Sequence, residues 1–343
     1  MRIELFILLQ ILLTFSQEAL PISENKINKD WDKTLFKFMK KNGQEGHFKG
    51  ANNKRINHFK ITGKGKKGAI IFVPGQGEPY IKHFELFYDL LKMGHSPIYT
   101  LDLRGQGHSE RMLKNPKKGY IDSFDNYIKD FSLFLKKVVL KDKNKNLFLI
   151  THSTGGAITL LYLMEDEKRH RMFNKAVFCS PLIKLNTRPF PYAFIKWMTE
   201  LFCKSKFFCR MYAPGESKFN AYEKFENNPL TSNENRWYQT QRVSKKAGDI
   251  WFNGPTIKWV HEVNKIYPRF KNYKGKIKLP FLFLQASDDK VVKPKPQEDF
   301  CKKMKGNCKF IRIENSKHEI LMEKDLVRNK ALRLINHFFN SKL

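Results

Sequence analysis

One stretch constrains the fold of this chain more than any other. Residues 146–164 read Asn-Leu-Phe-Leu-Ile-Thr-His-Ser-Thr-Gly-Gly-Ala-Ile-Thr-Leu-Leu-Tyr-Leu-Met. A short apolar run comes first, small residues surround Ser153, and apolar residues at helical spacing follow. The stretch therefore predicts a buried strand, a sharp turn and a helix, with Ser153 in the turn.

A serine in such a turn is typical of a nucleophile, because the strained backbone presents the hydroxyl at the end of the sheet. The usual pattern is Gly-x-Ser-x-Gly, in which small residues let neighbouring segments approach closely. Here Thr151 and Gly155 occupy the outer positions. We predict Ser153 as the nucleophile and expect the β-branched Thr151 to give a tighter turn that still forms.

Composition and charge narrow the class of protein. The 343 residues, 41% of them hydrophobic, suit one large domain or a core with an insertion. Lys+Arg number 64 and Asp+Glu 33, which gives a net charge of +31. Such a charge favours anionic surfaces, although a compositional bias toward Lys, Asn, Ile and Phe would also produce it. No helix-turn-helix, zinc-finger or RNA-binding signature is present, so we expect no nucleic-acid partner.

The first 20 residues have a basic start and an apolar run interrupted only by Gln10. A membrane span would need about 20 predominantly apolar residues, so the pattern is closer to a signal peptide. Glu4 is unusual in a basic region, which leaves an uncleaved membrane anchor as the alternative. We expect an exported (periplasmic or extracellular) or membrane-associated protein rather than a cytoplasmic one.

The five cysteines allow two interpretations. Cys203 and Cys209 are close in sequence, as are Cys301 and Cys308, while Cys179 lies within an apolar strand pattern. Two disulfides and one buried thiol would suit an oxidising compartment, and five reduced thiols are the alternative. The cysteines show no metal-ligand spacing, so we expect no metal site.

Along the chain, strand patterns alternate with helical ones, which predicts an α/β fold with a mostly parallel sheet flanked by helices. We expect strands at residues 47–49 and 56–61 (an antiparallel hairpin), 68–73, 96–102, 146–151, 175–181, from 277, and 308–313. We expect helices within 21–54 and at 81–93, 124–139, after Ser153, and at 321–339.

The pattern changes between residues 182 and 276, where aromatic residues crowd together and no strand of the main sheet is evident. We interpret this segment as a helical cap, between core segments at 21–181 and 277–343 and after the leader at 1–20. Its aromatic residues would suit acyl chains or an ordinary helical core. Its basic residues would suit an anionic bilayer surface; they are Lys184, Arg188, Lys196, Lys204, Lys206 and Arg210.

The ends of the expected strands carry the candidate site residues. The Gly-rich turn at 74–78 either simply reverses the chain or directs the Gln76 N–H at an oxyanion, with the Thr154 N–H as second donor. Asp102 and Arg104 could be catalytic, although a structural role in pinning their loop is the expected one. His108 is an alternative base, but no carboxylate at a suitable spacing is evident to orient it.

A carboxylate and a histidine follow the last two strands. Asp289 comes after the strand that begins at 277, with Asp288 as its rival, and His318 comes after the strand at 308–313. With Ser153 they give the chain order Ser, Asp, His. Four motifs at the ends of successive strands, in the right order, are stronger evidence than the serine turn alone.

With these motifs, residues 68–343 resemble the lysophospholipase and monoacylglycerol lipase branch of the α/β-hydrolases, most closely bacterial lysophospholipases. The similarity is carried by the segments at 74–78, 102–109, 152–156, 254–256, 288–292 and 317–324. The resemblance implies Ser153 as nucleophile, Asp289 as acid, His318 as base, and Gln76 and Thr154 as oxyanion donors. Pro74 departs from the histidine that many relatives carry, and Thr151 from the usual small residue.

The resemblance also implies the reaction and the substrate. We expect hydrolysis of the carboxylic ester of a single-chain lipid, foremost a lysophospholipid, through an acyl-enzyme and without a cofactor. A monoacylglycerol lipase, a general carboxylesterase and a lysophospholipid transacylase would share the same residues. A non-enzymatic lipid-binding module is a further alternative, which the complete triad argues against.

Overall fold

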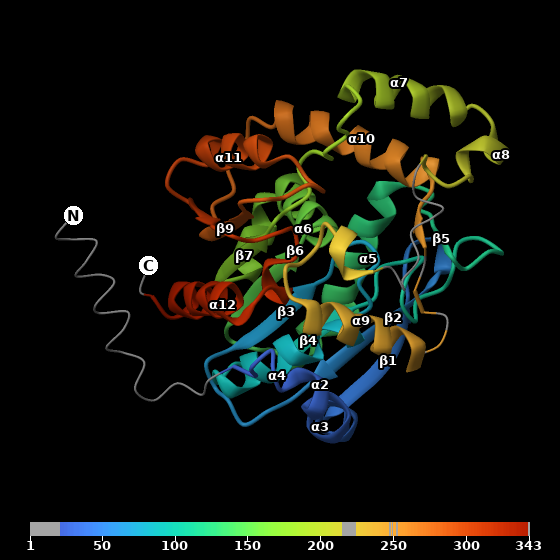
Figure 1. Cartoon of the computed structure of the whole chain (residues 1–343). Coiled ribbons are helices and arrows are strands. Elements are labelled where there is room, and N and C mark those ends of the chain that lie inside the picture. The colour runs from blue at the N-terminus through green and yellow to red at the C-terminus, as the bar shows by residue number, and fades with distance from the viewer. Residues whose placement is uncertain (1–20, 215–223, 247, 249, 252, 342–343) are drawn as a thin grey trace.

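The computed structural model describes residues 21–214, 224–246, 248, 250–251 and 253–341 (Figure 1). Its centre is an eight-stranded sheet in the order β1-β2-β4-β3-β6-β7-β9-β10. The strands are β1 (Gly43–Lys49), β2 (Arg55–Ile61), β3 (Ala69–Val73), β4 (Ile98–Leu101), β6 (Leu147–His152), β7 (Lys175–Cys179), β9 (Phe281–Ala286) and β10 (Cys308–Ile313). The pairs β1–β2 and β2–β4 are antiparallel, and all other neighbours are parallel.

The sheet separates two apolar cores, because successive side chains of a strand point to opposite faces. In β3, Ala69, Ile71 and Val73 enter one core, and Ile70 and Phe72 enter the other. The first core is covered by α5 (Phe124–Lys137), α6 (Thr154–Glu165) and α11 (Pro294–Lys303). The second is covered by a helical stretch formed of α2 (Ile27–Asp30), η1 (Trp31–Phe36) and α3 (Lys37–Asn42), and by α4 (Phe84–Lys92) and α12 (Asp325–Asn340).

The predicted α/β class is therefore confirmed, including the antiparallel opening hairpin and the helix after Ser153. The first strand begins at Gly43, earlier than expected. It pairs with β2 along its whole length, from Gly43 opposite Ile61 to Lys49 opposite Arg55. The extension was missed because Gly43 and Gly46 interrupt the alternating pattern, although each lies against an aromatic ring of β2.

The inserted segment, residues 182–276, contributes no described strand to the main sheet. It contains α7 (Tyr192–Phe202), α8 (Lys206–Cys209), α9 (Glu234–Lys246) and α10 (Ile257–Asn272). A short strand, β8 (Gly254–Pro255), pairs with β5 (Lys118–Gly119) outside the main sheet. Figure 1 shows α7, α8 and α10 grouped at one end of the molecule, whereas α9 lies apart from them and near α2, to which Asn235 links it through Asn28.

Of the two cysteine states that the sequence allows, the structure has the paired one. Disulfides join Cys203 to Cys209 and Cys301 to Cys308, and Cys179 is a buried free thiol. The expected leader at 1–20 lies outside the described residues. Within the residues that are described, no helix is both long and apolar enough to cross a membrane.

Candidate active site

Three strand ends bring the predicted serine, histidine and aspartate together. Ser153 directly follows β6, Asp289 comes shortly after β9, and His318 comes after β10. Nε2 of His318 lies 2.9 Å from Oγ of Ser153, and its Nδ1 lies 2.8 Å from Oδ2 of Asp289. All three side chains are buried. This is the geometry of a nucleophile, a base and an orienting carboxylate.

The backbone at Ser153 has the strained conformation that such a turn requires. Its φ is 48° and its ψ is −114°, a region that residues with a side chain rarely adopt. The next turn of chain fits only because Gly155 has no side chain: a Cβ there would lie 2.2 Å from the Val73 carbonyl oxygen. Thr151 stays in register in β6, opposite Val73 and Phe178, so the turn forms despite the missing first glycine.

Asp289, rather than Asp288, faces the histidine. Its Oδ1 accepts hydrogen bonds from the Val291 and Val292 amides, both at 2.9 Å. Burial favours the neutral acid, but His318 and these amides outweigh it and hold the pKa of Asp289 below its ordinary value. The side chain of Asp288 is 58% exposed and lies 3.9 Å from the Lys290 ammonium. The carboxylate beside the base is therefore ionised.

The two predicted oxyanion donors line one cavity together with Ser153. The amides on either side of Gln76 are occupied: Gly75 donates to Glu78 at 2.7 Å, and Gly77 donates to Gln106 at 3.0 Å. The Gln76 and Thr154 amides donate to no acceptor within the described part of the chain. They are therefore available to a substrate oxygen.

The motif at 102–109 contacts the loop at 74–78 and supplies none of the three side chains that meet at Ser153. Asp102 accepts from the Tyr80 and His108 amides at 2.8 and 2.7 Å. Arg104 is buried against Asp130, at 2.6 Å from Nε to Oδ2, and does not pair with Asp102. The expectation that no carboxylate orients His108 was wrong, since its Nδ1 lies 3.3 Å from Asp102. The imidazole within hydrogen-bond distance of the Ser153 hydroxyl is nevertheless that of His318.

Sequence reasoning missed three residues that hold the catalytic loops. The Gln106 side chain also donates to the Gly75 carbonyl at 2.9 Å, so it contacts the oxyanion loop on both sides of Gln76. Glu78 and His152 form a buried pair, with 2.7 Å between Oε1 and Nδ1. Their signal in the sequence was position alone: Glu78 ends the Gly-rich turn, and His152 precedes the serine.

A cavity of about 480 Å³ opens onto Ser153 and His318, a size typical of small-ligand sites. Its walls include Trp237 of α9 and Trp259 of α10, together with Trp251, Leu182 and Val260. The crowded aromatic residues of α7 and α8 are absent from these walls, and most of their side chains are exposed instead. The inserted segment thus lines the cavity with residues other than those that first suggested an acyl-chain pocket.

Comparison with known proteins places the chain in a family. The family described as serine aminopeptidase, S33, matches residues 64–325. The chain belongs to this family of α/β-hydrolases. Probable lysophospholipase L2 of Haemophilus influenzae is 32% identical over 272 residues, which cover 79% of this chain and 83% of that protein. Lysophospholipase L2 of Escherichia coli is 29% identical over 304 residues, covering 86% and 87%.

Solved structures share the fold. A soluble variant of monoglyceride lipase from Saccharomyces cerevisiae, bound to a substrate analogue, has a TM-score of 0.68 at 19% identity and covers 87% of this chain and 94% of its own. A thermostable carboxyl esterase from Bacillus coagulans has a TM-score of 0.67 at 14% identity, covering 87% and 98%. At these identities the likeness concerns the α/β-hydrolase fold, which agrees with the predicted fold class.

Proposed function

We propose that this protein is a serine hydrolase that cleaves the carboxylic ester of a single-chain lipid, foremost a lysophospholipid. The observation that carries the proposal is the hydrogen-bonded chain from Ser153 through His318 to Asp289 at the floor of a largely apolar cavity. The names of the most similar relatives, lysophospholipases L2, support the choice of substrate. The reaction needs no cofactor.

The first half-reaction transfers the acyl group to the enzyme. His318 Nε2 takes the proton of the Ser153 hydroxyl as Oγ attacks the ester carbonyl, and the ionised Asp289 stabilises the imidazolium that forms. The Gln76 and Thr154 amides donate to the oxyanion, where one donor contributes about 10²–10³ in rate. His318 then protonates the departing alcohol. Water attacks the acyl-enzyme by the same route and releases the fatty acid.

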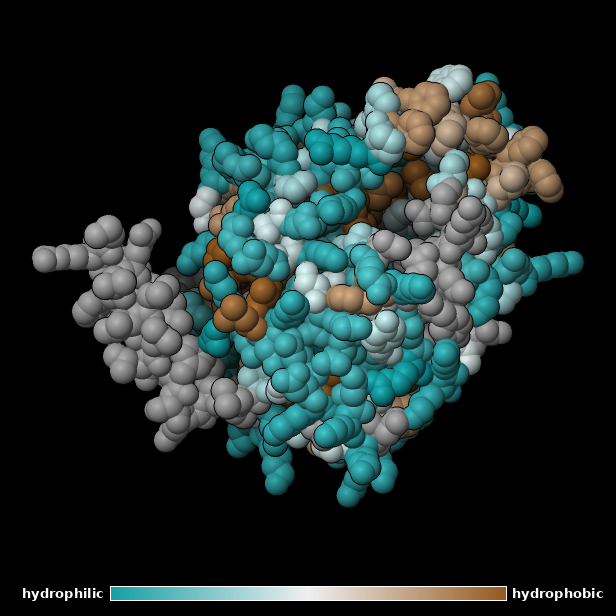
Figure 2. All heavy atoms as spheres, viewed as in Figure 1, coloured by the Kyte–Doolittle hydropathy of each residue, from teal (hydrophilic) through white to brown (hydrophobic). Residues whose placement is uncertain are grey.

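We further propose that the protein works at an anionic membrane surface. The α7–α8 surface is apolar and exposed, and it consists of Phe190, Phe194, Trp197, Leu201, Phe202, Phe207, Phe208 and Met211. Figure 2 shows this apolar area at one end of the molecule, over α7 and α8. Exposed cations lie in the same segment of the chain as these apolar side chains. They are Arg188, Lys196, Lys204, Lys206 and Arg210. Lys184 is half-buried over the rings of Tyr192 and Tyr267 and is not part of that surface.

Apolar side chains among cations suit a bilayer of anionic lipid, since the rings enter the headgroup boundary while the cations contact phosphates. A substrate with one acyl chain could leave that surface and enter the cavity.

We also propose that the protein is exported or membrane-associated. Its two disulfides support an oxidising compartment. Mass spectrometry of unreduced, alkylated protein from its natural source tests this: five alkylated cysteines would contradict it.

Product analysis on a panel of lipids tests whether lysophospholipid is the preferred substrate. Purified protein would be given lysophospholipids, monoacylglycerols and diacyl phospholipids at equal concentration, with Ser153→Ala as the control. We expect fatty acid release from lysophospholipid to exceed release from the other lipids and to vanish in the variant. Faster turnover of monoacylglycerol would favour a monoacylglycerol lipase, and transfer to a second lipid would favour a transacylase. Equal hydrolysis by wild type and variant would reject Ser153 as nucleophile.

Vesicle sedimentation tests whether the α7–α8 surface binds anionic membranes. We expect binding to vesicles with anionic lipid and little binding to neutral ones, and we expect Phe207→Ser with Trp197→Ser to weaken it. Leu326→Ser is the matched control, because Leu326 is 81% exposed on α12, outside the α7–α8 surface. Equal loss of binding in the control, or no loss in either variant, would contradict the assignment of this surface.

A further inference from the structure

A second histidine lies beside the catalytic one. His152 ends β6 and is buried, and the centre of its ring lies 4.8 Å from that of His318. Its Nδ1 is 2.7 Å from Oε1 of Glu78, and its Nε2 is 3.2 Å from the backbone carbonyl oxygen of His318. One imidazole therefore bridges a buried carboxylate and the main chain of the base.

The two contacts fix how many protons the pair holds. A carboxylate and a carbonyl are both acceptors, and a neutral imidazole has only one N–H to donate. Both contacts form when His152 is an imidazolium beside an ionised Glu78, or when the same proton lies on Glu78 and the imidazole is neutral. If that proton leaves, one of the two contacts must be lost, because an imidazole nitrogen then faces an acceptor without a hydrogen between them.

The groups around the pair favour the imidazolium. Burial opposes the charge on both groups, but their mutual attraction outweighs it, so the pKa of His152 lies above its ordinary value and that of Glu78 well below. Lys82 lies 3.9 Å from Glu78 and 2.5 Å from Glu319, and Nε2 of His83 lies 3.4 Å from Glu78. Burial lowers the pKa of His83, so it adds no competing charge.

The same carboxylate also reaches the oxyanion loop. Oε2 of Glu78 accepts the Gly75 amide at 2.7 Å, immediately before Gln76. The pair therefore connects three segments that must keep their spacing during catalysis: the oxyanion loop, the end of β6 and the loop of His318. Asp289 orients the ring of His318, whereas His152 holds its backbone.

We propose that the Glu78–His152 pair, holding one shared proton, is a positioning unit that fixes the backbone of His318 and the oxyanion loop relative to Ser153. The proposal rests on the proposed function, since it assigns a role within that reaction. His152 contacts neither the nucleophile's hydroxyl nor the substrate carbonyl in this role. It acts through His318, where a displacement of about 1 Å is enough to cost roughly 10²-fold in rate.

Two variants separate the two contacts. A glutamine amide places an N–H near the position of Nε2, and an asparagine amide places one near Nδ1. We expect His152→Asn, which leaves the His318 carbonyl without a donor, to lower kcat on a water-soluble p-nitrophenyl ester by roughly 10²-fold with a smaller change in KM. We expect His152→Gln to retain most of kcat. Equal losses in the two variants would indicate a merely structural residue and overturn the proposal.

The pH profile gives a second readout. The pKa of His152 is raised, so both contacts are present below that pKa. As pH rises through it, the one remaining N–H stays on Nδ1 beside the charged Glu78, 2.7 Å away, so the contact to the neutral His318 carbonyl is lost. We expect kcat of the wild type to fall on the alkaline side and this limb to be absent in His152→Gln, whose amide has no proton to lose. An unchanged alkaline limb in that variant would contradict the proposal.

Nuclear magnetic resonance of the wild-type protein with ¹⁵N-labelled histidine decides the question even if the variants do not fold. We expect two protonated ring nitrogens for His152 at neutral pH, or the proton shared with Glu78. A ring with one N–H beside an ionised Glu78 would overturn the proposal. This measurement does not depend on the proposed function, which fails separately if ester hydrolysis by the wild type does not require Ser153.

Discussion

Gly155 packs directly against the backbone of Val73, so that a Cβ at Gly155 would lie 2.2 Å from the Val73 carbonyl oxygen and 2.6 Å from that of Pro74. Val73 and Pro74 lead directly into the loop that carries Gln76. Gly155, two residues after Ser153, therefore sets the distance between the turn of Ser153 and the loop that carries Gln76. Backbone atoms cannot rotate away as a flexible side chain could.

We accordingly expect Gly155→Ala to lower kcat by about 10²–10³, the effect of losing one oxyanion donor. Gly156→Ala is the matched control, because its Cβ would meet Pro181, with the Cβ at 2.8 Å and the Cα at 3.1 Å, and Pro181 follows β7 rather than leading into the loop that carries Gln76. It should cost less activity. Steady-state kinetics on a soluble ester, with thermal unfolding as the check on folding, measures both, and a fully active Gly155→Ala would contradict the prediction.

The two neighbouring aspartates allow a second matched pair. Asp289→Asn keeps the shape of the side chain but removes the charge that orients His318, and we expect kcat to fall by about 10⁴. Asp288→Asn should leave kcat unchanged, because that side chain is exposed and its nearest cation, Lys290, is 3.9 Å away. Similar losses in both variants would mean that the acid has been assigned to the wrong residue.

The convergence of Ser153, Asp289 and His318 could be predicted because each of them follows a strand whose apolar pattern is plain in the sequence. Parallel strands align their carboxyl ends, so residues far apart in the chain converge without any knowledge of side-chain packing. Asp289 could be preferred to Asp288 only from the family's spacing. The structure gives the physical basis, since the Val291 and Val292 amides hold the carboxylate of Asp289 toward the base.

The supporting contacts could not be predicted in the same way. Glu78 and Gln106 lie in two different loops and His152 ends β6, and their contacts depend on how these segments pack rather than on strand periodicity. The aromatic residues of α7 illustrate the same limit. Their composition fits a helical core, a lipid pocket or an exposed surface, and only the packing of the helix shows that Phe194 and Trp197 are exposed.

Thr151 is the position where the sequence departs from the usual turn. Its side chain is fully buried in β6, and its hydroxyl finds no hydrogen-bond partner among the described residues. We expect Thr151→Gly to leave kcat largely intact. It should lower the free energy of unfolding by about 1–2 kcal/mol through lost packing and added flexibility of the unfolded chain. Denaturant unfolding and kinetics measure the two effects, and a loss of activity in stably folded variant protein would show a role beyond packing.

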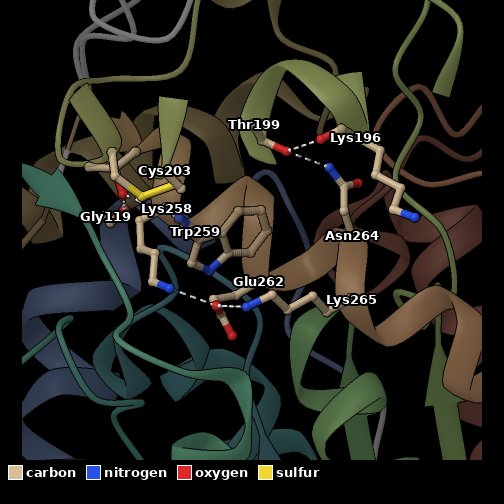
Figure 3. The surroundings of a disulfide bond; sticks show 11 residues. Gly119, Lys196, Thr199, Cys203, Lys258, Trp259, Glu262, Asn264 and Lys265 are labelled. Atoms are coloured by element: carbon tan, nitrogen blue, oxygen red, sulfur yellow. Dashed lines mark hydrogen bonds and ion pairs between the residues drawn. A yellow bond between two sulfur atoms is a disulfide. The ribbon is translucent and has the colours of Figure 1, made fainter. Parts of the chain in front are cut away.

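The disulfide between Cys203 and Cys209 joins the end of α7 to the end of α8. Figure 3 shows it near the contact between these helices and α10, where Thr199 receives a hydrogen bond from Asn264 at 3.3 Å. We expect Cys203→Ser with Cys209→Ser to weaken binding to anionic vesicles, because the exposed rings of α8 lose their fixed position. Hydrolysis of a soluble ester should be unchanged.

The second disulfide provides the control for that prediction. Cys301 and Cys308 join α11 to β10, outside the α7–α8 surface. Their double serine variant should lower the free energy of unfolding by about 2–3 kcal/mol and leave vesicle binding unchanged. Vesicle sedimentation and denaturant unfolding, applied to both variants, separate the outcomes. Undiminished binding without the Cys203–Cys209 bond would show that α8 does not need this cross-link.

Arg236 links α9 to the core. It is fully buried, and its guanidinium lies 2.8 Å from both Glu85 of α4 and Asp325 of α12 while donating to the Glu323 carbonyl at 2.6 Å. The same helix carries Trp237, which lines the cavity. Arg236→Met would leave the buried carboxylate of Glu85 with less compensation, and such losses cost about 3–5 kcal/mol in the free energy of unfolding. We also expect a higher KM, since α9 would be held less firmly.

Arg171→Met is the control for this change, because Arg171 is an exposed residue, and substitutions of that kind usually alter stability by less than about 0.5 kcal/mol. Urea unfolding gives the two free energies, and kinetics on a soluble ester gives KM. If Arg236→Met is as stable as Arg171→Met, the buried carboxylate has found other compensation, for which Arg328, 3.5 Å from Glu85, is the nearest source. The double variant with Arg328→Met would then show the loss that the single one did not.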